Sequence, residues 1–198
     1  MLFLKVEQST KQGLVIVPLL LVLVGEVFAQ DGLLAKVPQL QETARRSNRG
    51  ELGSGIGTVT LITSGGQVKS QSGLDPIRVF GSTIIVSDLL PLLKARAQFN
   101  HSGVANPMSG EVSDLTYVVL YTLSLAKDPN SISVIVELLK DKEDTIRGWS
   151  AIALYAIAES SAHSRAKIQG VKFPQAAVDS AKARGVKPPA WLQIESGI

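Results

Sequence analysis

The stretch 129–158, PNSISVIVELLKDKEDTIRGWSAIALYAIA, constrains the fold most strongly, because it has the pattern of two amphipathic helices in succession. In its first part, apolar residues recur at spacings of three and four, which places them on one face of a helix: Ile132, Ile135, Val136 and Leu139. The second part repeats this spacing at Ile146, Trp149, Ala153, Leu154 and Ile157. The charged residues 140–144 between the two parts are too polar for a core and predict a tight turn.

The ends of the two predicted helices carry matching signals. Asp128 and Asn130 can accept hydrogen bonds from free backbone N–H groups, and Pro129 suits the first position of a helix. Asp144 stands at the N-cap position of the second helix. The second helix is rich in small residues, which allow a neighbouring helix to approach closely: Ser150, Ala151, Ala153, Ala156 and Ala158.

This stretch also resembles a known family of helical repeats. VIVELLKDKEDTIRGWSAIALYAIA is similar to the HEAT-like repeats of bacterial proteins, including the type found in phycobilisome lyases. The matching positions are Leu138, Leu139, Lys140, Asp141, Ile146, Arg147, Ala151, Ala153, Leu154 and Ile157. Gly148 and Trp149 depart from the Glu and Ala types that are usual in the family. The resemblance implies an all-α fold, an α-α superhelix of HEAT- or armadillo-like helix pairs, in which Arg147 ties neighbouring repeats through an acidic turn.

Because one helix pair cannot bury its own apolar face, repeats of this kind need neighbours. DPIRVFGS at 75–82 lines up with DTIRGWSA at 144–151, so that Arg78 would have the structural role of Arg147. Residues 114–125 form another small and apolar helical pattern of similar length. The predicted structural repeat residues are Asp144, Ile146, Arg147, Leu154 and Arg78. The alternative is a chance similarity between two D-x-I-R tetrapeptides.

The N-terminus has the layout of a secretory signal peptide over residues 1–29. Lysines precede the apolar run 13–25, and VFA follows it, which predicts cleavage after Ala29. A membrane anchor is the alternative, but a span needs ~20 apolar residues, and this shorter run contains Pro18. We therefore expect export to the periplasm, the cell surface or the extracellular space, and no stable membrane insertion after cleavage.

The expected mature chain, 30–198, has the length of a single domain with a hydrophobic core of its own. It contains no cysteine, which excludes disulfides, thiolate metal ligands and cysteine nucleophiles. Its last part, 160–198, contains six Lys or Arg and two acidic residues, and we interpret it as a basic C-terminal cap with Trp191 and Leu192 covering the last helix pair. A basic segment can attract nucleic acid. Because aromatic residues do not alternate with these cations as in single-strand binding, we expect no nucleic-acid partner.

Residues 50–73 are the least helical part of the chain. Glycines bound the β-branched run 58–63, a pattern typical of a strand in a small β-hairpin, and a degenerate repeat helix or another irregular insertion is an equally open interpretation. The glycine order G-x-G-x-G does not match a dinucleotide fingerprint, and no phosphate-binding loop motif is present. Elsewhere the pattern predicts a helix over 31–48 that is interrupted near Pro38, a helix over 77–97 that is divided near Pro91, and two short helices after residue 160.

The sequence offers no catalytic residue, metal ligand or cofactor site. The two histidines, His101 and His163, lie in segments where a solvated surface residue is the simplest interpretation. No H-E-x-x-H motif and no nucleophile elbow are present. The sequence therefore favours a binding protein over an enzyme.

Four aromatic residues are the candidates for contacting a partner: Trp149, Tyr155, Tyr117 and Tyr121. Core packing is their alternative role. The expected function is protein–protein interaction or scaffolding, with another protein as the partner and without catalysis. The alternative is a small enzyme or a lyase-related accessory that uses 50–73 as a ligand loop. A scaffold predicts an extended apolar or aromatic stripe, and an enzyme predicts a pocket with convergent polar groups.

Overall fold

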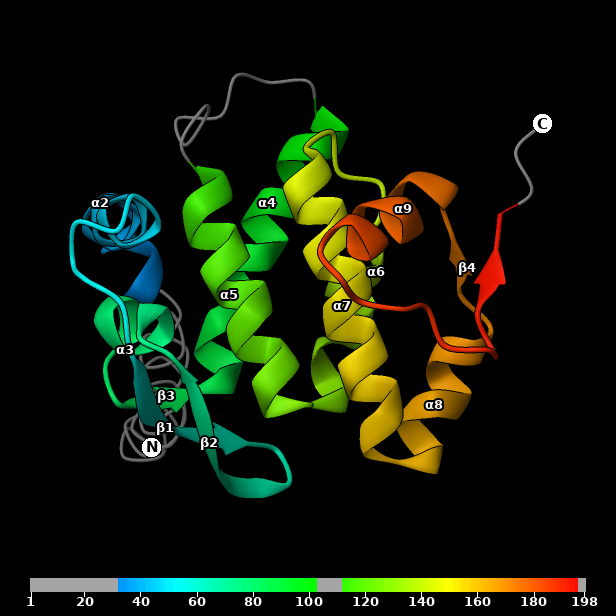
Figure 1. Ribbon diagram of the computed structural model, residues 1–198, viewed down its shortest axis with the longest axis horizontal. Helices are drawn as coiled ribbons and strands as arrows, with labels where there is room; N and C mark the ends of the chain where they lie inside the picture. Colours follow the sequence, from blue (N-terminus) through cyan, green and yellow to red (C-terminus); the bar gives the residue numbers. More distant parts are fainter. Residues whose placement is uncertain (1–31, 103–111, 196–198) are drawn as a thin grey trace, which may run out of the picture.

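The computed structural model describes residues 32–102 and 112–195 (Figure 1). This part of the chain is mostly helical and contains a small mixed sheet. The prediction of a mostly helical chain is therefore correct, but the described chain is not all-α. Strands lie at 56–63 and 66–73, where a small hairpin was one of the open interpretations, and at 83–85, 172–173 and 193–194, where none was expected. In the same ranges, no helix is both long and apolar enough to cross a membrane. The predicted signal peptide and its cleavage site at Ala29 lie outside the described residues.

The first described helix is interrupted, as the sequence predicted. Residues 32–34 are helical, the chain turns at 35–36, and α2 then runs from Val37 to Asn48. Pro38 lies in the first turn of α2, where its missing N–H breaks no hydrogen bond of the helix. Helix α2 packs against both α3 and α5 and buries Ala44 in the core.

The glycine-rich segment is a β-hairpin, so the repeat-helix interpretation of 50–73 is wrong. Strand β1 (Ile56–Thr63) pairs antiparallel with β2 (Gly66–Gly73), and β3 (Thr83–Ile85) pairs parallel with β1 on its other side. One face of this sheet is buried through Val59, Leu61 and Ile84. The other face leaves Ile62 and Ile85 exposed at neighbouring positions. An isolated hairpin is only marginally stable, and here a third strand and the helices beneath it complete the structure.

The helix predicted over 77–97 is divided into three pieces. Helix α3 (Asp75–Phe80) ends at Gly81, whose φ of 90° favours glycine, and the chain then enters β3. The 3-10 helix η1 (Val86–Leu89) leads into α4 (Leu90–Ser102). The alignment of 75–82 with a second repeat helix therefore holds only as far as Phe80, because the chain leaves the helix at Gly81 and the β-branched residues that follow pair with β1.

Two helix pairs form the centre of the molecule. After α4 come α5 (Val112–Ala126), the 3-10 helix η2 (Pro129–Ser131), α6 (Ile132–Leu138) and α7 (Asp144–Ser160). Helix α4 packs against α5, and α6 packs against α7. In addition α4 lies beside α6, and α5 lies beside α7 (Figure 1). The helices predicted at 114–125 and on both sides of the charged turn are confirmed.

The chain ends with two short helices and a minimal sheet. Helix α8 (Ala162–Gln169) follows α7, and α9 (Gln175–Ala183) packs along α7. The two-residue strands β4 (Lys172–Phe173) and β5 (Gln193–Ile194) pair in parallel. Trp191 and Leu192 are partly buried against the core.

The hydrophobic core is one cluster that includes side chains from the sheet and from all the central helices. Its largest fully buried members are Phe173, Leu61, Leu89, Leu93, Leu115, Leu120, Leu123, Ile135, Leu138, Leu139, Ile146 and Leu154. The structural repeat residues Ile146 and Leu154 are thus core residues. The connection between α5 and η2 also reaches the hairpin, because the Asp128 carboxylate accepts hydrogen bonds from the Ser64 backbone N–H and hydroxyl.

Candidate functional site

Arg147 closes the turn in front of its own helix. Its Nη1 donates to the carbonyl oxygens of Asp141 and Lys142, at 2.8 and 2.9 Å, and its Nη2 lies 3.3 Å from Asp144 Oδ1. These bonds satisfy carbonyl groups that the tight α6–α7 turn leaves outside any helix. Arg147 is therefore a structural residue of the turn, and the contacts that hold it come from its own helix pair.

A second arginine, which the sequence patterns did not single out, secures the same turn from α4. Arg96 donates from Nε and Nη2 to the two Asp141 carboxylate oxygens, at 2.8 and 2.7 Å, and from Nη2 to Glu143 Oε1 at 2.8 Å. The Arg96 and Asp141 side chains are 2% and 0% exposed. Burial disfavours the charged guanidinium, but the hydrogen bonds and charges of the two carboxylates outweigh it and raise the pKa of Arg96.

One sequence signal could have revealed Arg96. It lies on the buried side of α4, among Leu92, Leu93 and Ala97, where an unpaired charge would be very unfavourable. A single arginine in an apolar row therefore indicates a buried acidic partner. Asp141 lies 45 residues further along the chain, so no local sequence pattern could identify it as the partner.

Arg78 has a comparable structural role at the start of α3. Its Nη1 donates to the Gly53 carbonyl oxygen at 2.8 Å and to Ser47 Oγ at 3.2 Å, and it lies 3.8 Å from Asp75 Oδ1. The Ser47 hydroxyl also donates to the Asp75 carboxylate. These contacts join α3 to the loop that follows α2.

Asp144 is not the N-cap that its position suggested. The N-cap of α7 is Glu143, and Asp144 instead accepts hydrogen bonds from Ser180 Oγ at 3.0 Å and from Arg184 Nη1 at 3.3 Å. Desolvation acts to raise the pKa of the Asp144 carboxyl, but these hydrogen bonds and the charges of Arg184 and Arg147 lower it below 3.8. Asp144 therefore joins α7 to α9.

Three of the four predicted partner-binding aromatics lie together. Tyr117 and Tyr121, one turn apart on α5, stack with ring centroids 6.2 Å apart. Trp149 of α7 lies against both rings, with centroids 5.0 Å from Tyr117 and 5.6 Å from Tyr121. The Tyr121 hydroxyl accepts a hydrogen bond from the Gly73 N–H at 3.1 Å, which links the cluster to the end of β2. All three side chains are half-buried.

Tyr155 does not belong to this cluster. It follows Trp149 by six residues, which turns its side chain by about 240° around the helix, toward the core. Tyr155 is 3% exposed and lies against Phe173, with ring centroids 5.6 Å apart. Burial raises the pKa of its hydroxyl to about 12. Tyr155 therefore lies in the core, which was its alternative role, and is not exposed for contact with a partner.

The aromatic cluster is the middle of a longer half-buried face, which we name the α5–α7 face. One row of side chains on α5 and one row on α7 form it at helical spacings of three and four residues: Asp114, Tyr117, Tyr121 and Leu125 on α5, and Thr145, Trp149, Ile152 and Ala156 on α7. Most of the described positions that flank the two rows are buried, while Ser124 is half-buried and Asp144 is exposed. The two rows provide an extended aromatic and apolar stripe on the molecule.

A hollow of about 290 Å³ lies at one end of the α5–α7 face. Its walls come from the end of α2, the start of α5 and the start of α7: Asn48, Asp114, Tyr117, Glu143, Thr145 and Trp149. Asn48 Nδ2 donates to Asp114 Oδ1 at 2.6 Å. Burial, together with the charge of Asp75 and the neighbouring Tyr121, raises the pKa of Tyr117 to about 12, so its phenol is neutral at physiological pH.

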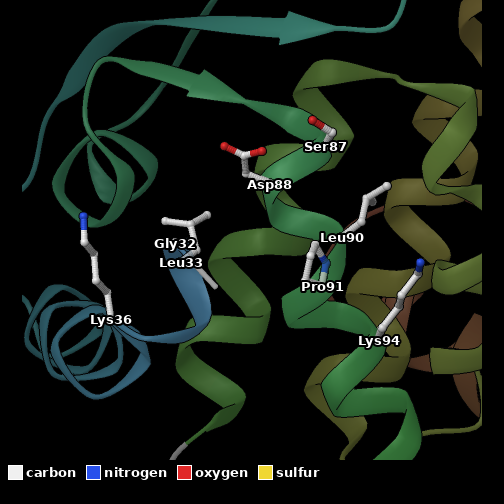
Figure 2. Close-up of a pocket in the computed structure, with 8 residues that line it drawn as sticks. All are labelled: Gly32, Leu33, Lys36, Ser87, Asp88, Leu90, Pro91 and Lys94. Atoms are coloured by element: carbon white, nitrogen blue, oxygen red, sulfur yellow. The ribbon is translucent and has the colours of Figure 1, made fainter. Parts of the chain in front are cut away.

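A larger hollow of about 500 Å³ lies between the first described residues and the start of α4 (Figure 2). It is lined by Gly32, Leu33, Lys36, Ser87, Asp88, Leu90, Pro91 and Lys94. Figure 2 shows Lys36 and Lys94 on opposite sides with Asp88 between them. These polar groups do not converge on one point, so their arrangement does not favour a specific ligand.

The glycines of the hairpin serve packing. A Cβ atom on Gly57 would lie 2.5 Å from Ile77 Cδ1 and 3.1 Å from Leu74 Cδ2, and one on Gly55 would lie 3.0 Å from Leu74 Cδ1. Glycine at these positions therefore lets the start of β1 lie directly against α3 and the residue before it. This packing role explains the glycines without a ligand.

No protein-family model, curated protein or solved structure matches the chain. Within 32–102 and 112–195, no group of three or more His, Cys, Asp or Glu side chains is arranged to hold a metal ion. The α5–α7 face and its hollow are therefore the candidate functional site.

Proposed function

We propose that this protein is an exported protein–protein interaction or scaffolding module that binds its partner through the α5–α7 face and has no catalytic activity. One observation carries the proposal: two helices bring Tyr117, Tyr121 and Trp149 together on a face that stays half-exposed. Tyrosine and tryptophan are the residues that most often dominate the energy of protein interfaces, because they bury large areas and lose little conformational freedom.

We further propose that the two central helix pairs are HEAT-like repeats. In this interpretation α4 and α5 form one unit, α6 and α7 form the next, and α8 and α9 belong to the C-terminal cap within 160–198. The first helices of the two units, α4 and α6, pack against each other, and so do the second helices, α5 and α7. This arrangement supports the interpretation. Units stacked in this way bury a continuous core that no single unit can form.

The exported location is proposed from residues 1–29 alone. Cleavage after Ala29 would leave Gln30 as the first residue, two positions before the first described residue. The test is the intact mass of the protein recovered from cells that produce it naturally. A mass that corresponds to 30–198 supports the proposal, and a mass that includes the apolar run 13–25 contradicts it.

The binding proposal is tested by capturing the partner on immobilised 30–198. The test variant is Trp149→Ala with Tyr121→Ala, which removes two rings of the cluster. The matched control is Ile62→Ala with Ile85→Ala, which removes two apolar side chains from the exposed face of the sheet. We expect the same protein to be retained by the wild type and the control and lost from the test variant, with both variants folded by circular dichroism. Equal retention by all three would contradict the proposal.

The alternative, an enzyme or a lyase-related accessory that uses 50–73 as a ligand loop, has less support. It predicts a pocket with convergent polar groups built by this segment. Neither of the two hollows described above is lined by residues 50–73. Gly55 packs against Leu74, and Gly57 packs against Leu74 and Ile77, which accounts for two of the three glycines of the G-x-G-x-G run without a ligand.

A further inference from the structure

We propose that the hollow at the end of the α5–α7 face receives a cationic group, namely a lysine or arginine side chain presented by the partner protein. This inference rests on the proposed function and adds the chemistry of the contact. Two independent features of the hollow point to it: aromatic walls whose rings are tilted against each other, and two lining carboxylates, one from α5 and one from the N-cap of α7.

The aromatic walls come from Tyr117 and Trp149. Their rings lie 5.0 Å apart and are tilted by 56°, so they form two differently directed walls of the hollow. The face of an aromatic ring carries negative potential, and tryptophan attracts a cation most strongly. The Tyr117 phenol is neutral at physiological pH and therefore adds no phenolate charge to the hollow.

The carboxylates come from Asp114 and Glu143. Asn48 positions Asp114 through Oδ1, and Arg96 positions Glu143 through Oε1; among the described residues, each of these oxygens accepts one side-chain hydrogen bond. A carboxylate has about four acceptor sites, so one such bond leaves it able to accept from an incoming ammonium or guanidinium group. Among the described residues that line the hollow, none is a lysine or an arginine.

The surrounding positive charges do not reverse this preference. Arg96 is buried behind Glu143 and also pairs with Asp141. Arg147 and Arg184 both pair with Asp144, at 3.3 Å, and Arg184 also donates to Thr145 Oγ1 at the rim. The starts of α5 and α7 add partial positive charge, which makes an anion the main competitor for the hollow.

The test uses Trp149 as its own reporter. Trp191→Phe leaves Trp149 as the only tryptophan of the chain. Its fluorescence is followed during titration with N-acetyl-arginine amide and N-acetyl-lysine amide. Sodium chloride provides the ionic control, sodium phosphate is the anion probe, and tetramethylammonium chloride represents a free small cation. We expect a saturable change with the two amides, weaker binding of tetramethylammonium, and no saturable change with the sodium salts.

Variants of the walls sharpen the result. In the same background, Tyr117→Leu should weaken the binding of the arginine amide about two- to fivefold, because one ring face is lost. Asp114→Asn should weaken it by a similar factor of about two to five. Asp179→Asn, an exposed charge on α9, is the matched control and should leave the binding unchanged. Thermal unfolding of each variant shows that the fold is retained.

Several outcomes would overturn the inference. A saturable response to phosphate in place of the amides would assign the hollow to an anion at the helix starts. Tighter binding of tetramethylammonium than of both amides would assign it to a small free ligand. If the partner is captured through Trp149 and Tyr121 but no cation binds, only this inference falls. If capture is insensitive to these two rings, the proposed function falls, whatever the titrations give.

Discussion

The chain contains two segments that begin alike and end differently. Helices α3 and α7 both start with an aspartate that is followed three residues later by an arginine, in DPIR and DTIR. In both, the arginine donates to backbone carbonyl groups that precede its helix and lies within 4 Å of the aspartate, at 3.8 Å for Arg78 and 3.3 Å for Arg147. Yet α3 has 6 residues and α7 has 17. The shared motif therefore determines how a helix begins and not how far it continues.

The residues after the motif account for the difference in length. In α3, Gly81 adopts a backbone conformation that ends the helix, and the β-branched residues 83–85 then pair with β1. In α7, small and apolar residues continue the helical pattern to Ser160, and α5 and α9 cover two of its sides. The helical region thus depends on packing along long helices, while the sheet region depends on one hairpin held against a short helix.

The largest expected difference between the regions concerns their aspartates. Asp141→Ala leaves Arg96 buried without its bidentate partner and should lower the free energy of unfolding by about 3–5 kcal/mol. Asp75→Ala, in the sheet region, removes the partly exposed pair with Arg78 and the hydrogen bond from the Ser47 hydroxyl, and should cost less, about 1–3 kcal/mol. Urea denaturation of both variants measures the two values. Equal losses would contradict a special role for the Arg96–Asp141 pair.

The second expected difference concerns apolar side chains. Leu154→Ala, at a fully buried position of α7, should lower the free energy of unfolding by about 2–5 kcal/mol. Ile62→Ala, at a position of the sheet that is 41% exposed, should change it by less than about 0.5 kcal/mol. Thermal unfolding checks both. An unchanged midpoint for Leu154→Ala would show that the described register of α7 is wrong.

The third expected difference concerns two glycines, each of which lies very close to a neighbouring segment of the chain. A Cβ on Gly148 would overlap Ser180 Oγ and lie 3.1 Å from the Ser180 carbonyl carbon, so Gly148→Ala should destabilise the protein by about 1–3 kcal/mol. A Cβ on Gly57 would meet only the flexible end of Ile77 and the side chain of Leu74, so Gly57→Ala should cost less. Chemical denaturation ranks the two. A larger loss of stability for Gly57→Ala than for Gly148→Ala would contradict the prediction that the α7–α9 contact tolerates an added methyl group less well than the sheet does.

Two tyrosines provide a fourth test. Tyr121→Phe removes the hydrogen bond from the Gly73 N–H that joins the sheet to α5, and should cost about 0.5–1.5 kcal/mol. Tyr155→Phe should cost nothing at neutral pH, because within the described residues its buried hydroxyl has no hydrogen-bond partner. Urea denaturation at pH 7 measures both values. A clear loss for Tyr155→Phe would reveal a partner for that hydroxyl.

The same variant has a signature at high pH. The pKa of Tyr155 is raised from 10.0 to about 12 in the folded protein, so the unfolded state loses this proton first. The contribution of the neutral hydroxyl to stability is therefore fully present below pH 10 and is lost as the pH rises toward 12. Tyr155→Phe should reduce this decline in the free energy of unfolding. An unchanged pH dependence would contradict the raised pKa.

The smallest expected effect is at the α7–α9 contact. The pKa of Asp144 lies below 3.8 in the folded protein, so its contribution is present above that pH and is lost as the pH falls through the folded value. Asp144→Asn should therefore be slightly less stable than the wild type at pH 7, with the difference disappearing in acid. A difference that grows in acid would contradict this sign.

The sequence predicted the elements that depend on local pattern. The helix pair around the charged turn, the interrupted first helix and the two short helices after residue 160 are confirmed. The hairpin at 50–73 was one of two open alternatives. Of the helix predicted over 77–97, residues 77–80 and 90–97 are helical, with a division near Pro91 as expected. The prediction was wrong at 81–85, because the β-branched residues after Gly81 had a strand to pair with. That strand lies 20 or more residues earlier in the sequence.

The candidate site was predictable in part. Tyr117, Tyr121 and Trp149 were identified because large aromatics at helical spacing are visible in the sequence, and Tyr155 was included for the same reason. Which side of a helix faces solvent depends on its neighbours, and the position of α9 and Phe173 beside α7 was not visible locally. The Arg96–Asp141 pair was missed for a related reason, since its partners meet only in three dimensions.

The central claim is that the α5–α7 face contacts a protein partner. A photo-reactive amino acid at Ile152, within the face, and another at Ser133, exposed on α6, test it most directly in cells that produce the protein. We predict that one specific protein is crosslinked from Ile152 and not from Ser133, and that Trp149→Ala abolishes the product. Crosslinks from Ser133 alone, or a product that is insensitive to Trp149→Ala, would contradict the account.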